Sequence, residues 1–188
     1  MYRRFFKRLI DILASLGVLL LLSPFLLVIA VIIKLQDGGP VLFVQERVGK
    51  GARHFRILKF RSMPVNTANV ESKEVHKIRI TKFGKFIRRT NIDELPQLIN
   101  IFKGDMSLIG PRPCLPTQSE LITLRLEGGA YSCKPGLTGL AQVMSYDNMP
   151  NRVKADWDNR YARHITFVND VKVILKTLSY LTKEPPTY

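Results

Sequence analysis

The first part of the chain is dominated by one long apolar run. Residues 13–33 contain no charged side chain. As a helix rising about 1.5 Å per residue, this run would extend roughly 31 Å, about the thickness of the hydrocarbon core of a bilayer. Basic residues lie on both sides of the run: Arg3, Arg4, Lys7, Arg8 and Lys34. We therefore predict a membrane segment over residues 1–36. A signal peptide would have a shorter apolar region followed by a small-residue cleavage site.

Ser23 and Pro24 interrupt this run near its middle. Proline has no N–H to donate, and its ring clashes with the carbonyl four residues earlier, here that of Leu20. The Ser23 hydroxyl can bond a carbonyl that has lost its donor, so the pattern predicts a kink or a break. A kinked spanning helix would place its flanks on opposite sides of the membrane, whereas a re-entrant helix-break-helix would keep both on one side. Both flanks are basic, but large domains follow the charge rule poorly, so the residues alone leave both topologies open.

Residues 37–188 show the shorter periodicities of a small folded domain. Residues 41–45 and 55–61, separated by a glycine-rich turn, predict a β-hairpin. Residues 62–80 are polar and predict a loop. Helical periodicity marks four further segments: residues 81–89, 95–102, 153–163 and 167–181. The predicted fold class is α/β (α+β), a small and mostly helical domain with a short β-hairpin, carried on the membrane segment.

The composition indicates one basic domain. With 188 residues and a mean hydropathy of +0.02, the chain can bury one core and is not a polytopic transporter. Lys and Arg number 29 against 15 Asp and Glu, which gives a net charge of +14. This charge predicts an anionic partner, which could be nucleic acid, anionic lipid or a phosphorylated substrate. Cys114 and Cys133 lack the paired spacing of a zinc site and are expected to be reduced thiols.

Two adjacent carboxylates, Asp93 and Glu94, precede the predicted helix at 95–102. Pro96 must then lie in the first turn, which would place Asp93 or its neighbour at the N-cap. The positive end of the helix and the preceding Arg88 would both favour ionised carboxylates. Such a carboxylate can act as a nucleophile or bind a divalent cation. On these residues alone, a helix cap followed by a first-turn acid is the simpler interpretation.

Arg112 lies between Pro111 and Pro113, directly after a predicted short strand at 107–109. The prolines stiffen the backbone and limit the directions in which the guanidinium can point. An arginine held in this way suits bidentate binding of a phosphate, although a surface turn would explain the same pattern.

Four sequence blocks, in order along the chain, resemble the bacterial sugar transferase family. These are the monotopic phosphoglycosyl transferases that begin the assembly of surface glycans. The blocks are KFRSM at 59–63, DELPQL at 93–98, KGDMSLIGPRP at 103–113 and KPGLTGLAQV at 134–143. The membrane Ser23-Pro24 pair also matches. Together they resemble the minimal catalytic unit of the family, without the additional transmembrane helices that larger members carry in front.

The resemblance implies the transfer of a sugar 1-phosphate from a UDP-sugar to polyprenyl (undecaprenyl) phosphate, with release of UMP. Asp93 matches the nucleophile that forms an aspartyl-phosphosugar, and Glu94 matches the partner carboxylate that, with Asp93, binds Mg²⁺. The reaction would be the first membrane step in making a surface polysaccharide, O-antigen or glycoprotein glycan. The resemblance places five further side chains among the candidate substrate- and phosphate-binding residues: Arg88, Arg112, Lys59, Gln142 and Asp170.

The resemblance also implies a location and partners. The membrane helix would be re-entrant, with interfacial amphipathic helices beside it and the domain on the cytoplasmic face of the bacterial inner membrane. Inner-membrane lipids, a second copy of the chain and downstream glycosyltransferases are candidate partners. A nucleic-acid-binding protein is not expected, because no helix-turn-helix, RNA-binding or zinc pattern occurs. A catalytically inactive membrane scaffold is the alternative, and the intact Asp93-Glu94 pair argues against it. Residues 144–152 fall in a region that varies among relatives with the donor, and their sequence does not identify the donor sugar.

Overall fold

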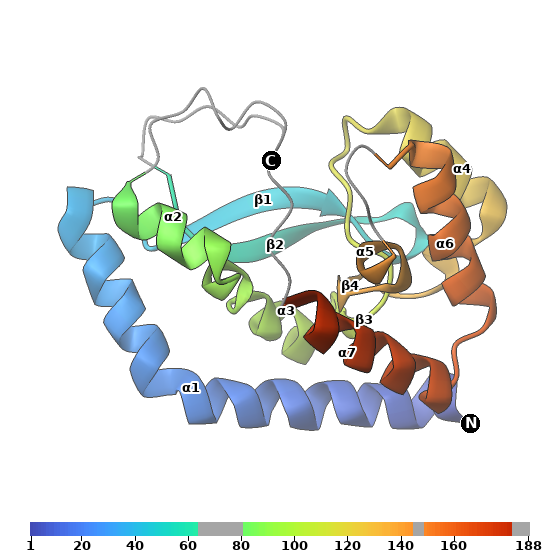
Figure 1. Ribbon diagram of the computed structural model, residues 1–188, viewed down its shortest axis with the longest axis horizontal. Helices are drawn as coiled ribbons and strands as arrows, with labels where there is room; N and C mark the ends of the chain where they lie inside the picture. Colours follow the sequence, from blue (N-terminus) through green and yellow to red (C-terminus); the bar gives the residue numbers. More distant parts are fainter. Residues whose placement is uncertain (64–80, 145–148, 182–188) are drawn as a thin grey trace.

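The computed structural model describes residues 1–63, 81–144 and 149–181. Most of the predicted 62–80 loop and the centre of the 144–152 stretch lie outside these ranges. The helices are α1 (Lys7–Asp37), α2 (Lys82–Arg89), α3 (Gln97–Lys103), α4 (Ser119–Gly128), α5 (Leu140–Val143), α6 (Asn151–Arg163) and α7 (Phe167–Leu181). The strands are β1 (Leu42–Val48), β2 (His54–Phe60), β3 (Ser107–Ile109) and β4 (Gly136–Thr138). The mostly helical α+β class is therefore confirmed (Figure 1).

The apolar run forms α1, a single long helix that contains Pro24. The two halves of α1 run in different directions, so that the helix bends along the lower and left edges of the molecule (Figure 1). As expected, the Ser23 hydroxyl donates to the carbonyl of Leu20, at 2.8 Å. This bond gives a donor to a carbonyl that Pro24 cannot serve. The interruption is therefore a bend within one continuous helix, and not the break that the helix-break-helix prediction required.

Both halves of α1 pack on the same body. In the first half, Arg8 donates to the Ile101 and Phe102 carbonyls at the end of α3, at 2.6 and 2.7 Å. In the second half, Ile29 and Ile33 are buried in a cluster with Phe60 of β2 and Ile87 of α2. The side of α1 away from the body exposes large apolar side chains: Leu13, Leu20, Leu21, Leu27 and Leu35. So large an exposed apolar area indicates that this side of α1 is covered by another apolar medium.

The predicted hairpin is present, with β1 antiparallel to β2. Its first strand starts one residue later than predicted and ends three residues later, at Val48 instead of residue 45. Phe43 pairs with Lys59 and Arg47 pairs with Phe55, so these side chains share one face of the hairpin. The same face carries Ile57, which packs against Leu98 and Ile101 of α3 and Met106.

The expected N-cap at Asp93 is wrong. Asp93 lies in a separate 3₁₀ turn, Ile92–Glu94, and α3 begins only after Pro96. The turn starts at Asn91, whose backbone is left-handed (φ 54°), and the Leu95 N–H bonds the Ile92 carbonyl. Because Pro96 has no N–H, it cannot donate the next bond that would join the turn to the helix. The C-terminal end of α3 is at Gly104, whose left-handed backbone has a φ of 102°.

The remaining body contains two features that the sequence patterns did not reveal. Strand β4 pairs in parallel with β3, and a side chain at Gly136 would come within 2.1 Å of the Gly110 nitrogen. Helix α4 packs against α6, where Arg125 and Asp158 form a fully buried ion pair. Helix α7 has the predicted bounds and lies beside the first half of α1 (Figure 1).

Candidate functional site

Three segments meet to form the site: strand β2, the 3₁₀ turn at Ile92–Glu94, and the Gly-Pro-Arg-Pro segment after β3. Asn100 of α3 fixes the first two relative to one another. Its side-chain oxygen accepts from the Leu58 N–H at 2.9 Å, and its side-chain nitrogen donates to the Arg56 carbonyl at 2.8 Å. The Asn100 amide therefore satisfies backbone groups of β2 as a neighbouring strand would. This contact holds α3, and with it the preceding turn at Ile92–Glu94, against β2, which carries Lys59.

Glu94 is held between two cations. Lys59 Nζ lies 2.8 Å from Glu94 Oε1, and the Arg112 guanidinium donates to both carboxylate oxygens. Burial would raise the pKa of Glu94, but Arg112 and Lys59 outweigh burial and hold this pKa well below its usual range. Burial lowers the pKa of Lys59, and the charge of Arg112 lowers it further, while Glu94 opposes both effects without cancelling them. Glu94 is therefore ionised at all ordinary pH values.

Asp93 has a different environment from its neighbour. Within the part of the chain that the structure describes, no group donates a hydrogen bond to its carboxylate. Burial raises its pKa to about 6, and Glu94 adds to this rise while Lys59 and Arg88 oppose it. The expectation that both carboxylates are biased toward ionisation is thus wrong for Asp93. Its carboxylate is ionised at neutral pH but is more basic than an ordinary aspartate, which makes it the more nucleophilic of the pair.

Arg88 lies in the last turn of α2, and its positive charge acts to lower the pKa of Asp93. Its NH1 group is buried and has no hydrogen-bond partner among the described residues. A buried donor without an acceptor is costly unless a ligand supplies one. The structure thus brings together five of the residues selected from the sequence: Lys59, Arg88, Asp93, Glu94 and Arg112.

Gln142 does not join this cluster. Its nitrogen donates to the Leu137 carbonyl at 3.2 Å, and its buried oxygen has no partner among the described residues. No described hydrogen bond connects Gln142 with Asp93 or Glu94.

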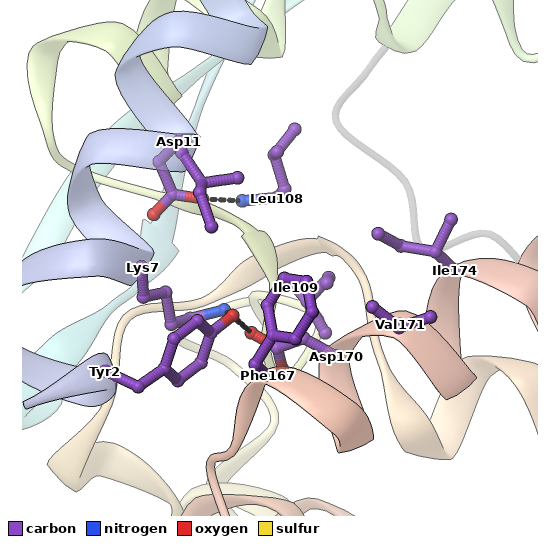
Figure 2. Close-up of a pocket in the computed structure, with 10 residues that line it drawn as sticks. Tyr2, Lys7, Asp11, Leu108, Ile109, Phe167, Asp170, Val171 and Ile174 are labelled. Carbon is purple, nitrogen blue, oxygen red and sulfur yellow. Dashed lines mark hydrogen bonds and ion pairs between the residues drawn. The ribbon is translucent and has the colours of Figure 1, made fainter.

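Asp170 is also outside the cluster and is fully occupied by the protein. Its carboxylate accepts from Tyr2 at 2.6 Å, Lys7 at 2.7 Å and Tyr161 at 2.7 Å. Figure 2 shows Tyr2, Lys7 and Asp170 around a small cavity between α1 and α7. The cavity holds about 40 Å³, room for a water molecule and not for a sugar nucleotide. Asp170 therefore joins the start of α1 to α6 and α7, in place of the predicted role in phosphate binding.

Asp93 and Glu94 are the two site carboxylates that could take part in a magnesium site completed by a substrate. No group of three or more His, Cys, Asp or Glu side chains occurs in the described residues. Mg²⁺ in phosphate-processing sites is commonly held by one or two carboxylates together with substrate phosphates and water. The Asp93 carboxylate fits that arrangement, whereas Glu94 could join it only by giving up part of its pairing with Lys59 and Arg112.

Arg47 is a member of the charged cluster that the sequence patterns missed. Its guanidinium donates to the Pro113 carbonyl at 3.2 Å and to Gln45 Oε1 at 2.5 Å. Because the predicted strand stops at Gln45, the sequence pattern does not place Arg47 on either face of the hairpin. Extending the strand alternation by two residues would have placed Arg47 on the face that carries Lys59.

Comparisons with known proteins identify the family of this chain. The model of the family described as bacterial sugar transferase matches residues 2–184. A UDP-N-acetylgalactosamine-undecaprenyl-phosphate N-acetylgalactosaminephosphotransferase of Aeromonas hydrophila is 42% identical over 93% of this chain and 43% of its own length. A UDP-glucose:undecaprenyl-phosphate glucose-1-phosphate transferase of Caulobacter vibrioides is 37% identical over 97% of this chain and 72% of its own length.

A third relative is close to this chain in extent. The exopolysaccharide production protein PSS of Rhizobium leguminosarum is 38% identical over 94% of this chain and 96% of its own length. By contrast, the chain spans only about two fifths of the first relatives that it matches. The family match covers nearly every residue, including all four sequence blocks, and the chain therefore belongs to the bacterial sugar transferase family.

Proposed function

We propose that this chain transfers a sugar 1-phosphate from a UDP-sugar to undecaprenyl phosphate and releases UMP. The observation that carries the proposal is the contrast between two adjacent carboxylates. Glu94 is fixed by Lys59 and Arg112, whereas Asp93 is half-buried, basic and without a hydrogen-bond donor among the described residues. The names of the Aeromonas and Caulobacter relatives supply the substrate class, a UDP-sugar and undecaprenyl phosphate.

The proposed chemistry has two displacements at phosphorus. An Asp93 oxygen attacks the phosphorus that carries the sugar, and the bond from this phosphorus to the UMP oxygen breaks. A phosphate oxygen of undecaprenyl phosphate then attacks the same phosphorus and displaces the Asp93 carboxylate. Both steps bring anions together, so Lys59, Arg88 and Arg112 would offset the repulsion. Asp93 and Glu94 would hold Mg²⁺, which would neutralise charge on the diphosphate.

We further propose that α1 enters and leaves one leaflet. Both halves of α1 are bonded to or packed on the same body, and the side away from the body is apolar. A helix that crossed the bilayer could not keep both of its ends on one cytosolic body. Helix α7 would lie at the interface, since it exposes Phe167, Ile174, Leu175 and Leu178. This topology would place the site on the cytoplasmic face of the inner membrane, where it would start the assembly of a surface polysaccharide.

The experiment is UMP release by the purified protein with Mg²⁺, undecaprenyl phosphate and a panel of UDP-sugars. We expect release with at least one donor and none from Asp93→Asn. The matched control is Asp156→Asn, which removes one negative charge from an exposed position on α6. With labelled donor and no lipid acceptor, wild-type protein should retain label covalently and Asp93→Asn should not. No UMP release with any donor would instead support the inactive scaffold.

A further inference from the structure

Arg47 is a cation of the site that has no carboxylate of its own. Among the described residues no acidic side chain lies within ion-pair distance of it, and both of its hydrogen-bond acceptors, Pro113 and Gln45, are neutral. Its Nε is buried and has no partner among these residues. Burial, and then the neighbouring charge of Arg112, lower the pKa of Arg47 to about 10. Arg47 contacts the carbonyl of Pro113, the residue after Arg112, and two such neighbouring cations repel each other unless an anion lies between them.

Among the residues that the structure describes, the charges of the cluster do not balance. Lys59, Arg88, Arg112 and Arg47 carry four positive charges, whereas Asp93 and Glu94 carry two negative charges when both are ionised. The excess matches the charge of a diphosphate bridge. Arginine is suited to such a ligand, because its planar guanidinium offers several donors to phosphate oxygens.

The position of Arg47 in the hairpin favours a water-soluble ligand over a lipid phosphate. The start of the hairpin, at Val41 and Phe60, packs against the second half of α1. Arg47 pairs with Phe55, four residues along β2 from Lys59, which is roughly 13 Å at the rise of an extended strand. Its neighbour Val48 packs against Leu121 of α4, so this end of the hairpin lies away from the second half of α1 (Figure 1).

We propose that Arg47 binds the diphosphate of the UDP-sugar together with Arg112. The inference rests on the proposed function and adds to it a residue that recognises the donor. Arg112 would then contact both Glu94 and the diphosphate, and Arg47 would contact the diphosphate alone.

The test compares three variants of the full chain in membrane nanodiscs. Arg47→Gln removes the charge, Arg47→Lys keeps it without the fork of donors, and Arg56→Gln makes the same charge change on the exposed face of the same hairpin. Binding of UDP and of uridine is measured by calorimetry, and KM for undecaprenyl phosphate is measured with a working donor. Thermal unfolding of each variant is recorded in parallel.

We expect Arg47→Gln to weaken UDP binding tenfold or more, about the effect of losing a charged hydrogen bond, and to leave uridine binding and KM for undecaprenyl phosphate within about twofold. Arg47→Lys should recover part of the loss, and Arg56→Gln should bind UDP as the wild type does. Unchanged UDP binding by Arg47→Gln would overturn the proposal. So would an equal loss for UDP and uridine, which would mean a purely structural role, or a rise in KM for the lipid alone. Wild-type protein that binds UDP but turns over no donor would contradict the proposed function instead.

Discussion

Replacing Asp93 by asparagine should abolish turnover and, at the same time, stabilise the folded protein. Burial raises the pKa of this carboxyl from 3.8 to about 6, so the folded state disfavours the charged form. Each pKa unit corresponds to about 1.4 kcal/mol, and ionised Asp93 therefore costs the folded state about 3 kcal/mol at neutral pH. The neutral asparagine amide fills nearly the same volume and avoids this cost. For a chain of this size, the gain corresponds to a rise in Tm of roughly 6–12 °C.

The gain must also depend on pH in a defined direction. A carboxyl whose pKa is higher in the folded state destabilises the fold progressively as pH rises from 3.8 to about 6, and by a constant amount above that. The advantage of the Asp93→Asn variant should therefore be about 3 kcal/mol at neutral pH, fall to about half at pH 5, and nearly vanish near pH 4.

The assay is thermal unfolding of the purified variants in one detergent at these three pH values, with UMP release measured in parallel. The control is the adjacent Glu94→Gln, which should also abolish turnover but lower stability by about 2–4 kcal/mol, because it removes the negative charge that Lys59 and Arg112 share. The lower part of this range is expected because the Arg112 side chain is 39% exposed. A lower Tm for Asp93→Asn than for wild type, or a gain that does not change with pH, would refute the reasoning.

Four further predictions concern the same molecule. Because Asp93 must be ionised to attack phosphorus, kcat/KM should fall about tenfold per pH unit below its pKa of about 6, and a pH-rate profile that is flat from pH 7 to 5 would contradict this role. Removal of Mg²⁺ by a chelator should abolish UMP release and leave membrane association intact, as flotation in a lipid gradient would show. Pro24→Ala should restore the missing hydrogen bond and straighten α1. A cysteine placed at Tyr2 should be modified only from the cytoplasmic side in the parent protein, and in part of the molecules from the periplasmic side in the Pro24→Ala variant. Asp170→Asn should lower unfolding stability by about 3–5 kcal/mol, because the buried ammonium of Lys7 loses its counter-charge, while activity per folded molecule persists.

Local periodicity was sufficient for the elements whose apolar residues form a stripe. The bounds of α7 and the existence of α2, α6 and the hairpin follow from such stripes. Helix α4 has no stripe, since Leu121 is fully buried while Leu126 is 52% exposed, and its apolar residues are spread around the axis. Strand β4 has only three residues, and its partner β3 lies far away in sequence, so no local signal marks it.

The members of the site were easier to predict than their chemical states. The sequence blocks selected Lys59, Asp93, Glu94 and Arg112, and the structure brings these together. The opposite pKa shifts of the two neighbouring carboxyls depend on which one Lys59 and Arg112 reach, and this is decided by tertiary packing. The separate turn before Pro96 also depends on the left-handed backbone of Asn91, a conformation that the adjacent residues do not require.

The ion pair of Lys7 with Asp170 has a consequence for the order of events during synthesis. The two residues are 163 positions apart, and Asp11 of the same helix needs the Leu108 N–H and the Ser107 hydroxyl, which are also translated much later. Until those partners exist, the start of α1 carries charges that apolar surroundings would penalise, so it must remain hydrated. The start of α1 can complete these contacts only after Asp170 of α7 has been translated. The first residues of this helix to be translated are thus among the last to complete their polar contacts.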